Sequence, residues 1–284
     1  MAEFTIRELE KRDLLEATQV LAEGFPRASR DYWERCLYII GDRERPPGTP
    51  RFGYGIEDGG LMGVALALGS LHGPPDHPQT IVNISSWTVR PSHRGLAAKE
   101  LFRHASSFDG MTYSDLSAAS HTIKAITKLG FRESTAGQAL AIGIGKAPER
   151  SPRLIGVDEA ELAGLPAQKV EMFRHHERYG CVVLCLELKD HVAPLIFLPR
   201  RIKGIFPLAQ LIYCEKMSDF LDNSRVIYLW LLKRGFPALL VDASGSVDGL
   251  KGRYFPGKAA KYYKGEFPYH AVDHTYSEMI YIGF

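Results

Sequence analysis

The feature of this chain that most restricts its fold is a strand-like run joined by an Arg-Gly turn to an amphipathic helix. The segment Val89-Arg-Pro-Ser-His-Arg-Gly-Leu-Ala-Ala-Lys-Glu-Leu-Phe102 directly follows the apolar run Thr80 to Trp87. A helix that begins just after a strand aims its unpaired backbone N–H groups and the positive end of its dipole at one point, which favours a phosphate. Gly95 allows the chain to turn tightly at this point.

The residues around this glycine suit a phosphate site, but they do not require one. Ala97 and Ala98 are small enough for a ligand to approach the backbone, and Arg94 or Lys99 can add positive charge. An ordinary strand-to-helix connection with a basic surface explains the same residues equally well.

Strands and helices alternate through the first half of the chain. The patterns predict strands at residues 4–9, 52–56, 61–68, 80–89, 111–116 and 139–144, and helices at 12–23, 31–40, 97–108 and 121–129. Such alternation predicts an α/β fold in which a mixed sheet carries helices on its faces.

A polar, proline-containing segment, Lys146 to Pro152, is the predicted domain boundary, which gives domains at 1–147 and 148–284. The order of elements partly repeats beyond it. A helix is expected within residues 158–178 and another over 222–234, with strands at 181–188, 193–198, 210–215, 238–242 and 277–283. The endings Lys128-Leu-Gly-Phe131 and Lys233-Arg-Gly-Phe236 close the two matching helices.

Composition excludes several classes of protein. The 284 residues are 45% hydrophobic and 24% charged, which argues against disorder, and the net charge of +2 includes no block of like charge. Nucleic-acid or polybasic membrane binding therefore has no compositional support. The start lacks a signal-peptide pattern and the apolar runs are too short to span a bilayer, so a cytoplasmic protein is expected. Four cysteines without CxxC spacing indicate buried free thiols, with neither a metal site nor disulfides.

The residue pattern of the turn is typical of one protein family. Val-x-Pro-x-x-Arg-Gly at Val89 to Gly95, the Lys-Leu-Gly-Phe ending and the order of elements resemble the GNAT acyltransferase superfamily over Phe4 to Ile144. The resemblance implies a mixed, mostly antiparallel sheet that splits between two central strands, with acetyl-CoA or another acyl-CoA as co-substrate. The whole chain is similar to tandem GNAT proteins, with a divergent second domain.

The resemblance also implies which residues hold the cofactor. Residues 94–99 would form the pyrophosphate loop, and residues 111–116 would be the strand across the split. The implied cofactor-binding residues are Trp87, Val89, Arg94, Gly95, Leu96, Ala97, Ala98, Lys99 and Ser117.

Two positions depart from the family pattern. Lys99 stands where the loop usually has a small residue, and Ile126 stands where many members have the Tyr that protonates the thiolate. The strand at 80–87 also lacks a carboxylate that would act as a base.

The catalytic candidates are therefore the polar residues near the end of the opposite strand, namely His121, Ser120, Tyr113 and Asp115. An imidazole at His121 suits the deprotonation of an amine or hydroxyl. Each candidate has a structural alternative: Ser120 as a helix cap with His121 in the exposed first turn, Asp115 as a turn cap, and Tyr113 as a core aromatic.

Three segments of the second half carry open alternatives. The basic stretch at 197–204 can contact a phosphate or an acyl carrier protein, although a solvated hairpin is favoured. The aromatic and lysine-rich stretch at 254–263 is expected to be a loop. His274 and Glu278 either enter a site or lie on the solvated face of a strand.

Together these observations predict transfer of an acetyl or longer acyl group from coenzyme A to an amine, or a hydroxyl, of a small-molecule acceptor. One alternative is a long-chain N-acyltransferase that uses acyl carrier protein. Another is a degenerate, non-catalytic GNAT-like protein that binds a ligand. A homodimer is expected on fold analogy alone.

Overall fold

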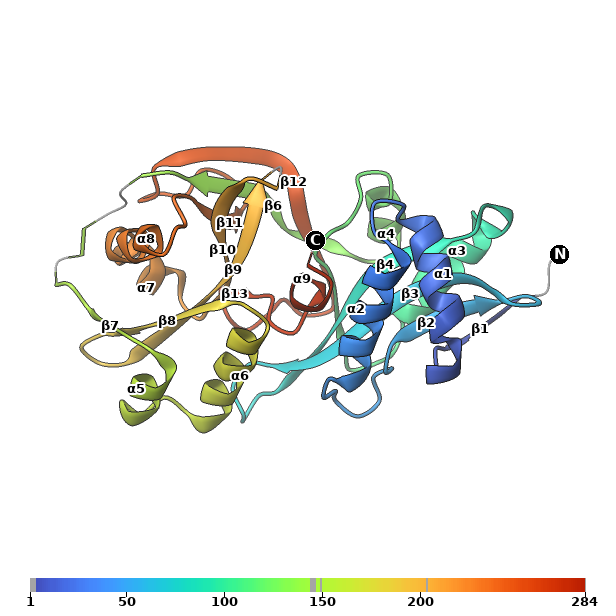
Figure 1. The fold of residues 1–284 in the computed structure, drawn as a ribbon, viewed down its shortest axis with the longest axis horizontal. Helices are drawn as coiled ribbons and strands as arrows, with labels where there is room; N and C mark the ends of the chain where they lie inside the picture. Colours follow the sequence, from blue (N-terminus) through green and yellow to red (C-terminus); the bar gives the residue numbers. More distant parts are fainter. Residues whose placement is uncertain (1–3, 144–146, 149, 203, 284) are drawn as a thin grey trace. The chain divides into compact units, whose positions relative to one another are not determined.

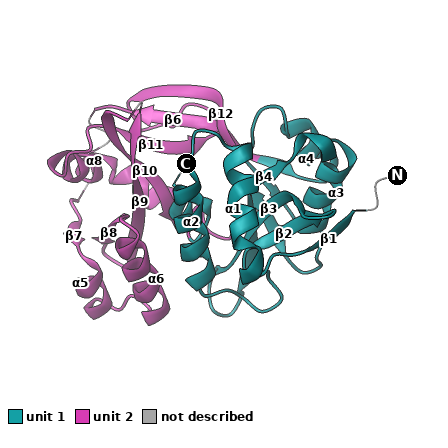
Figure 2. Ribbon diagram, turned by 45° about the vertical axis from the view of Figure 1, so that its right-hand side comes forward, with its two compact units in different colours: residues 1–133, 261–267, 276–284 teal, residues 134–260, 268–275 magenta. Residues whose placement is uncertain are grey.

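The computed structural model describes residues 4–143, 147–148, 150–202 and 204–283 (Figure 1). The chain divides into two compact units, coloured separately in Figure 2. Unit 1 comprises Met1–Glu133, Lys261–Phe267 and Tyr276–Phe284, and unit 2 comprises Ser134–Ala260 and Pro268–Thr275. The division falls before the predicted boundary at 146–152, of which residues 146 and 149 lie outside the described residues. The reason is that β6 (Arg132–Ala141) pairs with β11 (Leu239–Ala243) of the second half.

Unit 1 is built on a sheet in which the strands of the first half lie in chain order. These strands are β1 (Thr5–Glu8), β2 (Gly53–Glu57), β3 (Leu61–His72), β4 (Gln79–Val89) and β5 (Thr112–Asp115). Neighbours are antiparallel except β4 and β5, which are parallel. The last residues of β12 (Gly252–Lys264) pair with β5 on its other side. The sheet is therefore mixed and mostly antiparallel, as the sequence predicts.

Helices cover both faces of this sheet. They are α1 (Leu14–Gly24), α2 (Arg30–Asp42), α3 (Leu96–Ala105), α4 (Ile123–Lys128) and the C-terminal α9 (Glu278–Tyr281), with short 3-10 turns at Lys11–Asp13 and Pro91–His93. Figure 1 shows α1 and α2 on one face and α3 on the other.

Side chains along β3 point alternately to the two faces of the sheet, and this explains why helices pack on both faces. Val64, Leu66 and Leu68 are buried in one core with residues of α1 and α2. The residues between them, Ala65 and Ala67, lie on the opposite face, where α3 contacts β3. Small side chains there let the helix come close to the sheet.

Unit 2 has its own sheet. Its strands are β6, β11, β10 (Phe206–Cys214), β9 (Val192–Ile202), β8 (Val182–Glu187) and β7 (Arg153–Ile155) in that spatial order, with β12 beside β6 and β13 (Val272–Asp273) on β10. The strands β10 and β11 run parallel, whereas the pairs β10–β9, β9–β8, β8–β7 and β11–β6 are antiparallel. The helices are α5 (Val157–Leu162), α6 (Ala167–Arg178), α7 (Met217–Asp222) and α8 (Ser224–Lys233).

Three expectations from the sequence are corrected. The stretch at 254–263 is not a loop but part of β12. The stretch at 277–283 is not a strand, because the Ser277 hydroxyl accepts a hydrogen bond from the Met279 amide and so caps α9. The helix expected within 158–178 is two helices, because Gly164 adopts a positive φ of 92° and Pro166 follows. The prediction of free, buried cysteines is confirmed.

Among the described residues, no helix is both long enough and apolar enough to cross a bilayer.

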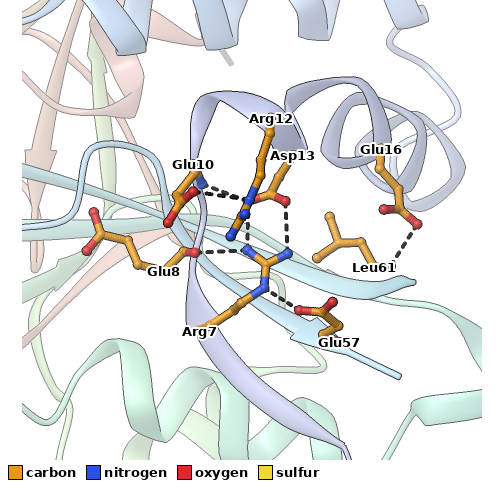
Figure 3. Close-up of polar contacts among 8 residues, drawn as sticks. All are labelled: Arg7, Glu8, Glu10, Arg12, Asp13, Glu16, Glu57 and Leu61. Carbon is orange, nitrogen blue, oxygen red and sulfur yellow. Dashed lines mark hydrogen bonds and ion pairs between the residues drawn. The ribbon is translucent and has the colours of Figure 1, made fainter. Parts of the chain in front are cut away.

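A polar network ties the start of the chain to the sheet of unit 1 (Figure 3). The Arg7 guanidinium donates two hydrogen bonds to the Asp13 carboxylate, at 2.7 and 2.8 Å, and a third to Glu57. The Glu10 amide donates to the same Asp13 carboxylate at 2.8 Å. These contacts hold the pKa of Asp13 below its usual range, chiefly through the hydrogen bonds from Arg7.

We expect Asp13→Asn to destabilise the protein near neutral pH and to have little effect in acid. A carboxylate whose pKa is lowered on folding stabilises the folded state at any pH above its unfolded-state pKa of about 4. This contribution disappears as the pH falls through the pKa of the carboxylate in the folded state. Losing a charged hydrogen-bond partner costs about 1 to 3 kcal/mol. Chemical denaturation at neutral and acidic pH measures the effect, with the exposed Asp190→Asn as control. Equal destabilisation at both pH values would contradict the electrostatic origin.

Candidate active site

The two central strands of unit 1 part in the middle of the sheet. β4 and β5 are paired over Ile81–Asn83 and Thr112–Ser114. β5 ends one residue later, whereas β4 continues beside β3 as far as Val89. In the described structure the edge of β4 from residue 84 onward therefore has no backbone partner on the β5 side.

A β-bulge marks the place where the strands part. Leu66 of β3 pairs with Ser85, but Val64 pairs with Thr88, so β4 contains one residue more than its partner. Ser86 within this bulge has a φ of 49°, a conformation that non-glycine residues rarely adopt. Bulges bend a strand and change the direction of its side chains, and they often lie next to active sites.

The chain leaves β4 through the Arg-Gly turn and enters α3. Gly95 precedes the helix with a φ of 95° and a ψ of −110°, which a residue with a side chain adopts only under strain. A Cβ atom at this position would meet no atom within 4 Å, so the space above the turn is open. The Lys99 amide makes the first helical hydrogen bond, to the Gly95 carbonyl at 3.2 Å.

The first amides of α3, at residues 96–98, consequently point out of the helix end without helical acceptors. Arg94 and Lys99 are exposed beside them, and Arg94 donates a long hydrogen bond of 3.4 Å to the Val89 carbonyl. The turn thus presents N–H donors and two cationic side chains to an open space, which is the chemistry of an anion site.

A buried carboxylate from the C-terminal helix lies where β4 and β5 part. The Glu278 side chain is 1% exposed, and its Oε2 accepts hydrogen bonds from the hydroxyls of Ser85 and Ser117, the latter at 3.1 Å. The Glu278 amide donates to Asn83 Oδ1 at 2.8 Å. The other carboxylate oxygen, Oε1, has no hydrogen-bond partner within the described part of the chain.

A second buried carboxylate, Asp115, ends β5 next to the first. Ser117 joins the two groups, because its amide donates to Asp115 Oδ1 at 3.3 Å while its hydroxyl donates to Glu278. The buried Lys261 ammonium donates to the Leu116 carbonyl at 2.6 Å. Asp115, Ser117, Lys261 and Glu278 are referred to below as the carboxylate cluster.

Burial controls the protonation of this cluster. It raises the pKa of Asp115 to about 7, with the negative charge of Glu278 as the next contribution and the Ser117 amide and Lys261 opposing both. Burial also raises the pKa of Glu278, against the hydrogen bonds that stabilise its charged form. Two carboxyl groups that interact in this way titrate as a pair, and near neutral pH the pair can take up or release a proton.

The candidate catalytic residues lie in different surroundings. Asp115 belongs to the carboxylate cluster. Ser120 and His121 are exposed in the turn before α4 and form no hydrogen bond with either carboxylate in the described structure. The buried Tyr113 hydroxyl accepts from the Phe108 amide at 2.8 Å and donates to the Phe108 carbonyl at 3.1 Å.

The candidate cofactor-binding residues mostly follow the turn. Arg94, Gly95, Leu96 and Lys99 are exposed there, Ala98 is half-buried, and Ala97 is a buried residue in the first turn of α3. Val89 is buried at the end of β4, and the half-buried Trp87 ring packs on Phe102 with 4.7 Å between ring centroids. Ser117 lies in the carboxylate cluster instead.

The sequence did not identify Lys261, Asn83 and Ser85 as site residues, and it left Glu278 undecided. The only available signal was that Glu278 is a charged residue in the largely apolar C-terminal stretch. Its partners Asn83 and Ser85 are 195 and 193 residues away in the chain, and only folding brings them together.

Unit 2 has polar groups of its own. A cavity of about 420 Å³ is lined in part by Lys169, His191, Glu215 and Asp219. Its charged groups pair with one another, Lys169 with Glu215 at 2.5 Å and His191 with Asp219 at 2.9 Å. Elsewhere the buried His274 imidazole lies 3.1 Å from the Asp242 carboxylate.

Among the residues that the structure describes, no three His, Cys, Asp or Glu side chains are grouped to hold a metal ion.

No protein-family model and no curated protein sequence matches the chain. Several solved structures, however, are similar to it. A GCN5-related N-acetyltransferase from Anabaena variabilis aligns over 92% of this chain and 72% of its own, with a TM-score of 0.59 at 14% identity. One from Kribbella flavida aligns over 92% and 70%, with a TM-score of 0.54 at 14% identity. The chain has the fold of the GNAT superfamily.

A third structure extends the comparison. A protein of unknown function from Enterococcus faecalis, described as a probable N-acyltransferase, aligns over 92% of this chain and 72% of its own, with a TM-score of 0.54 at 10% identity. At such identities the likeness concerns the GNAT fold alone.

Proposed function

We propose that the chain is an acyltransferase that moves an acetyl or longer acyl group from coenzyme A to an amine, or a hydroxyl, of a small molecule. The observation that carries this proposal is the carboxylate cluster at the point where β4 and β5 part. A proton acceptor buried beside an unpaired strand edge suits the attack of an acceptor on a thioester. Two of the similar solved structures are named GCN5-related N-acetyltransferases, and acetyl transfer to an amine agrees with this chemistry.

In this proposal the Arg-Gly turn binds the pyrophosphate of coenzyme A. The amides at residues 96–98 donate hydrogen bonds to its oxygens, and Arg94 and Lys99 neutralise their charge. Gly95 leaves room for the phosphate to approach the backbone. The unpaired edge of β4 offers N–H and C=O groups along which an extended, amide-containing arm can lie.

The carboxylate cluster accepts the proton of the nucleophile. The acceptor nitrogen or oxygen attacks the thioester carbonyl, its proton passes to the Asp115 and Glu278 pair, and the carbon–sulfur bond breaks to leave a thiolate that takes a proton from solvent. Positioning of the two reactants supplies much of the rate, because direct acyl transfer requires no covalent intermediate with the protein. Ser120, His121 and Tyr113 are alternative proton donors or acceptors, and the variant His121→Ala tests the imidazole among them.

Calorimetric titration of the protein with coenzyme A, acetyl-CoA and palmitoyl-CoA tests the first step. We expect saturable binding of all three, because they share the pyrophosphate, and the tightest ligand identifies the length of the acyl group. Tight binding of palmitoyl-CoA alone would favour the long-chain alternative. Absence of binding for all three ligands would contradict the proposal and favour the non-catalytic alternative.

A further inference from the structure

One end of the sheet in unit 2 gathers residues from five separate segments. β10 and β11 run parallel and are paired at Ala209 and Leu239, so the residues just before both strands lie at the same end. The antiparallel partners β9 and β6 finish there, and β8 begins there. The Ile142 amide donates to the Lys251 carbonyl at 2.9 Å, which brings the start of β12 to this end as well.

Exposed apolar side chains concentrate at this end. Most of the large hydrophobic residues that are exposed in the described part of unit 2 lie in these segments, and they are Ile142, Tyr179, Ile202, Ile205, Phe206 and Leu232. Scattered exposed hydrophobics are common, but a group of them marks an interaction site.

Basic side chains surround these apolar residues. The segments 177–180, 199–202, 204–207, 232–236 and 248–251 carry Arg178, Arg200, Arg201, Lys233, Arg234 and Lys251. Their acidic residues are Glu177 and Asp248. The net charge of +2 for the whole chain therefore conceals a local excess of positive charge.

The apolar residues are most prominent on a projecting arm. The pairing of β9 with β10 continues to Ile202 and Phe206, whereas the described pairing of β9 with β8 ends at Phe197 and that of β10 with β11 begins at Ala209. Residues 200–202 and 204–208 thus form a two-stranded arm that extends past its neighbours on both sides. Ile205 at its turn is 80% exposed.

We propose that this end of unit 2 binds the surface of a membrane that contains anionic lipids. The tip of the arm enters the headgroup region with Ile202, Ile205 and Phe206, while arginine and lysine side chains contact lipid phosphates and extend their apolar stems along the interface. The site would recruit the protein to a lipid surface, independently of the acyl-transfer proposal.

The shape and chemistry of the arm favour a lipid surface over other partners. A stable protein interface buries about 800 Å² on each partner, which favours a broad surface over a projecting tip. Single-stranded nucleic acids are bound mainly through aromatic stacking, whereas two of the three exposed large hydrophobic residues on the arm are isoleucines. An acidic protein and a nucleic acid are therefore outcomes that the test has to separate.

Flotation of the full chain with vesicles tests this proposal. We expect it to bind vesicles of phosphatidylcholine with about one third phosphatidylserine at least about tenfold more tightly than phosphatidylcholine alone, because basic side chains are attracted to an anionic lipid surface. Binding should weaken as salt is raised. The triple variant Ile202→Ser, Ile205→Ser, Phe206→Ser and the double variant Arg201→Gln, Lys233→Gln, which removes two exposed cations, should each lose at least about tenfold in affinity.

The controls distinguish a specific lipid-binding site from nonspecific hydrophobic adsorption and from misfolding. Leu162→Ser removes a hydrophobic side chain of α5 that is 91% exposed, and it should leave vesicle binding unchanged. Circular dichroism should show that all variants remain folded, because the substituted side chains reach the surface. Lack of binding to anionic vesicles, or equal binding by the arm variants, would overturn the proposal. So would tighter binding to polyuridylate or to an acidic protein than to vesicles.

Discussion

Asp115→Asn is expected to lower kcat/KM for acyl transfer by at least about 100-fold, because a general base typically contributes that much. A carboxylate base is active when it is deprotonated. The wild-type rate should therefore rise with pH through about 7, the pKa to which burial raises Asp115, and then level off. The variant should lose this rise. Steady-state kinetics with acetyl-CoA from pH 5 to 9 measure both effects.

Glu278→Gln distinguishes the roles of the two carboxylates. If Asp115 is the final proton acceptor, removing the negative charge of Glu278 lowers the pKa of Asp115, and the rise in rate moves to lower pH. If Glu278 is the acceptor, the rise disappears in this variant instead. The exposed Asp109→Asn should behave like the wild type. A wild-type pH profile in Asp115→Asn and Glu278→Gln, together with its loss in His121→Ala, would contradict the cluster and favour His121.

Stability provides a second measurement for the same variant. The folded pKa of Asp115 is raised above the unfolded value of about 4, so its burial costs stability once the pH exceeds that value, and the cost is complete above the folded pKa of about 7. Asp115→Asn removes the charge. We expect its Tm to exceed that of the wild type at pH 8 and to match it near pH 4, as for other functional groups that are retained at a cost in stability.

Gly95→Trp is expected to weaken the binding of coenzyme A by at least about tenfold relative to the wild type. The substitution places a large side chain in the open space where the phosphate would lie, and it forces a residue with a Cβ atom into a backbone conformation with a φ of 95°. Calorimetric titration measures the loss.

Gly164→Trp is the matched control for this variant. Gly164 also has a positive φ, of 92°, and open space around its Cβ position, but it belongs to unit 2, between α5 and α6. It should bind coenzyme A like the wild type. Unchanged affinity in a folded Gly95→Trp protein would exclude the turn as the phosphate site, whatever the Asp115 variants show.

Local patterns predicted the first half of the fold well. The hairpin of β2 and β3, the run of β4, the turn and α3 follow from alternation, from glycine in the turn and from helical spacing, all of which act between neighbouring residues. The same reasoning failed for β12, whose lysines and aromatics do not alternate by polarity and whose pairing is with β5 and β6, more than 100 residues away.

By itself, then, the sequence determined a mixed sheet with helices on both faces, the Arg-Gly turn at the start of α3, and Asp115 as a candidate at the end of β5. Only the tertiary structure decided that Glu278 and Lys261 join Asp115, and that exposed apolar and basic residues from five segments meet at one end of unit 2. The physical reason is that periodicity encodes which face of an element is buried, whereas the meeting of side chains from distant segments depends on how the strands pair.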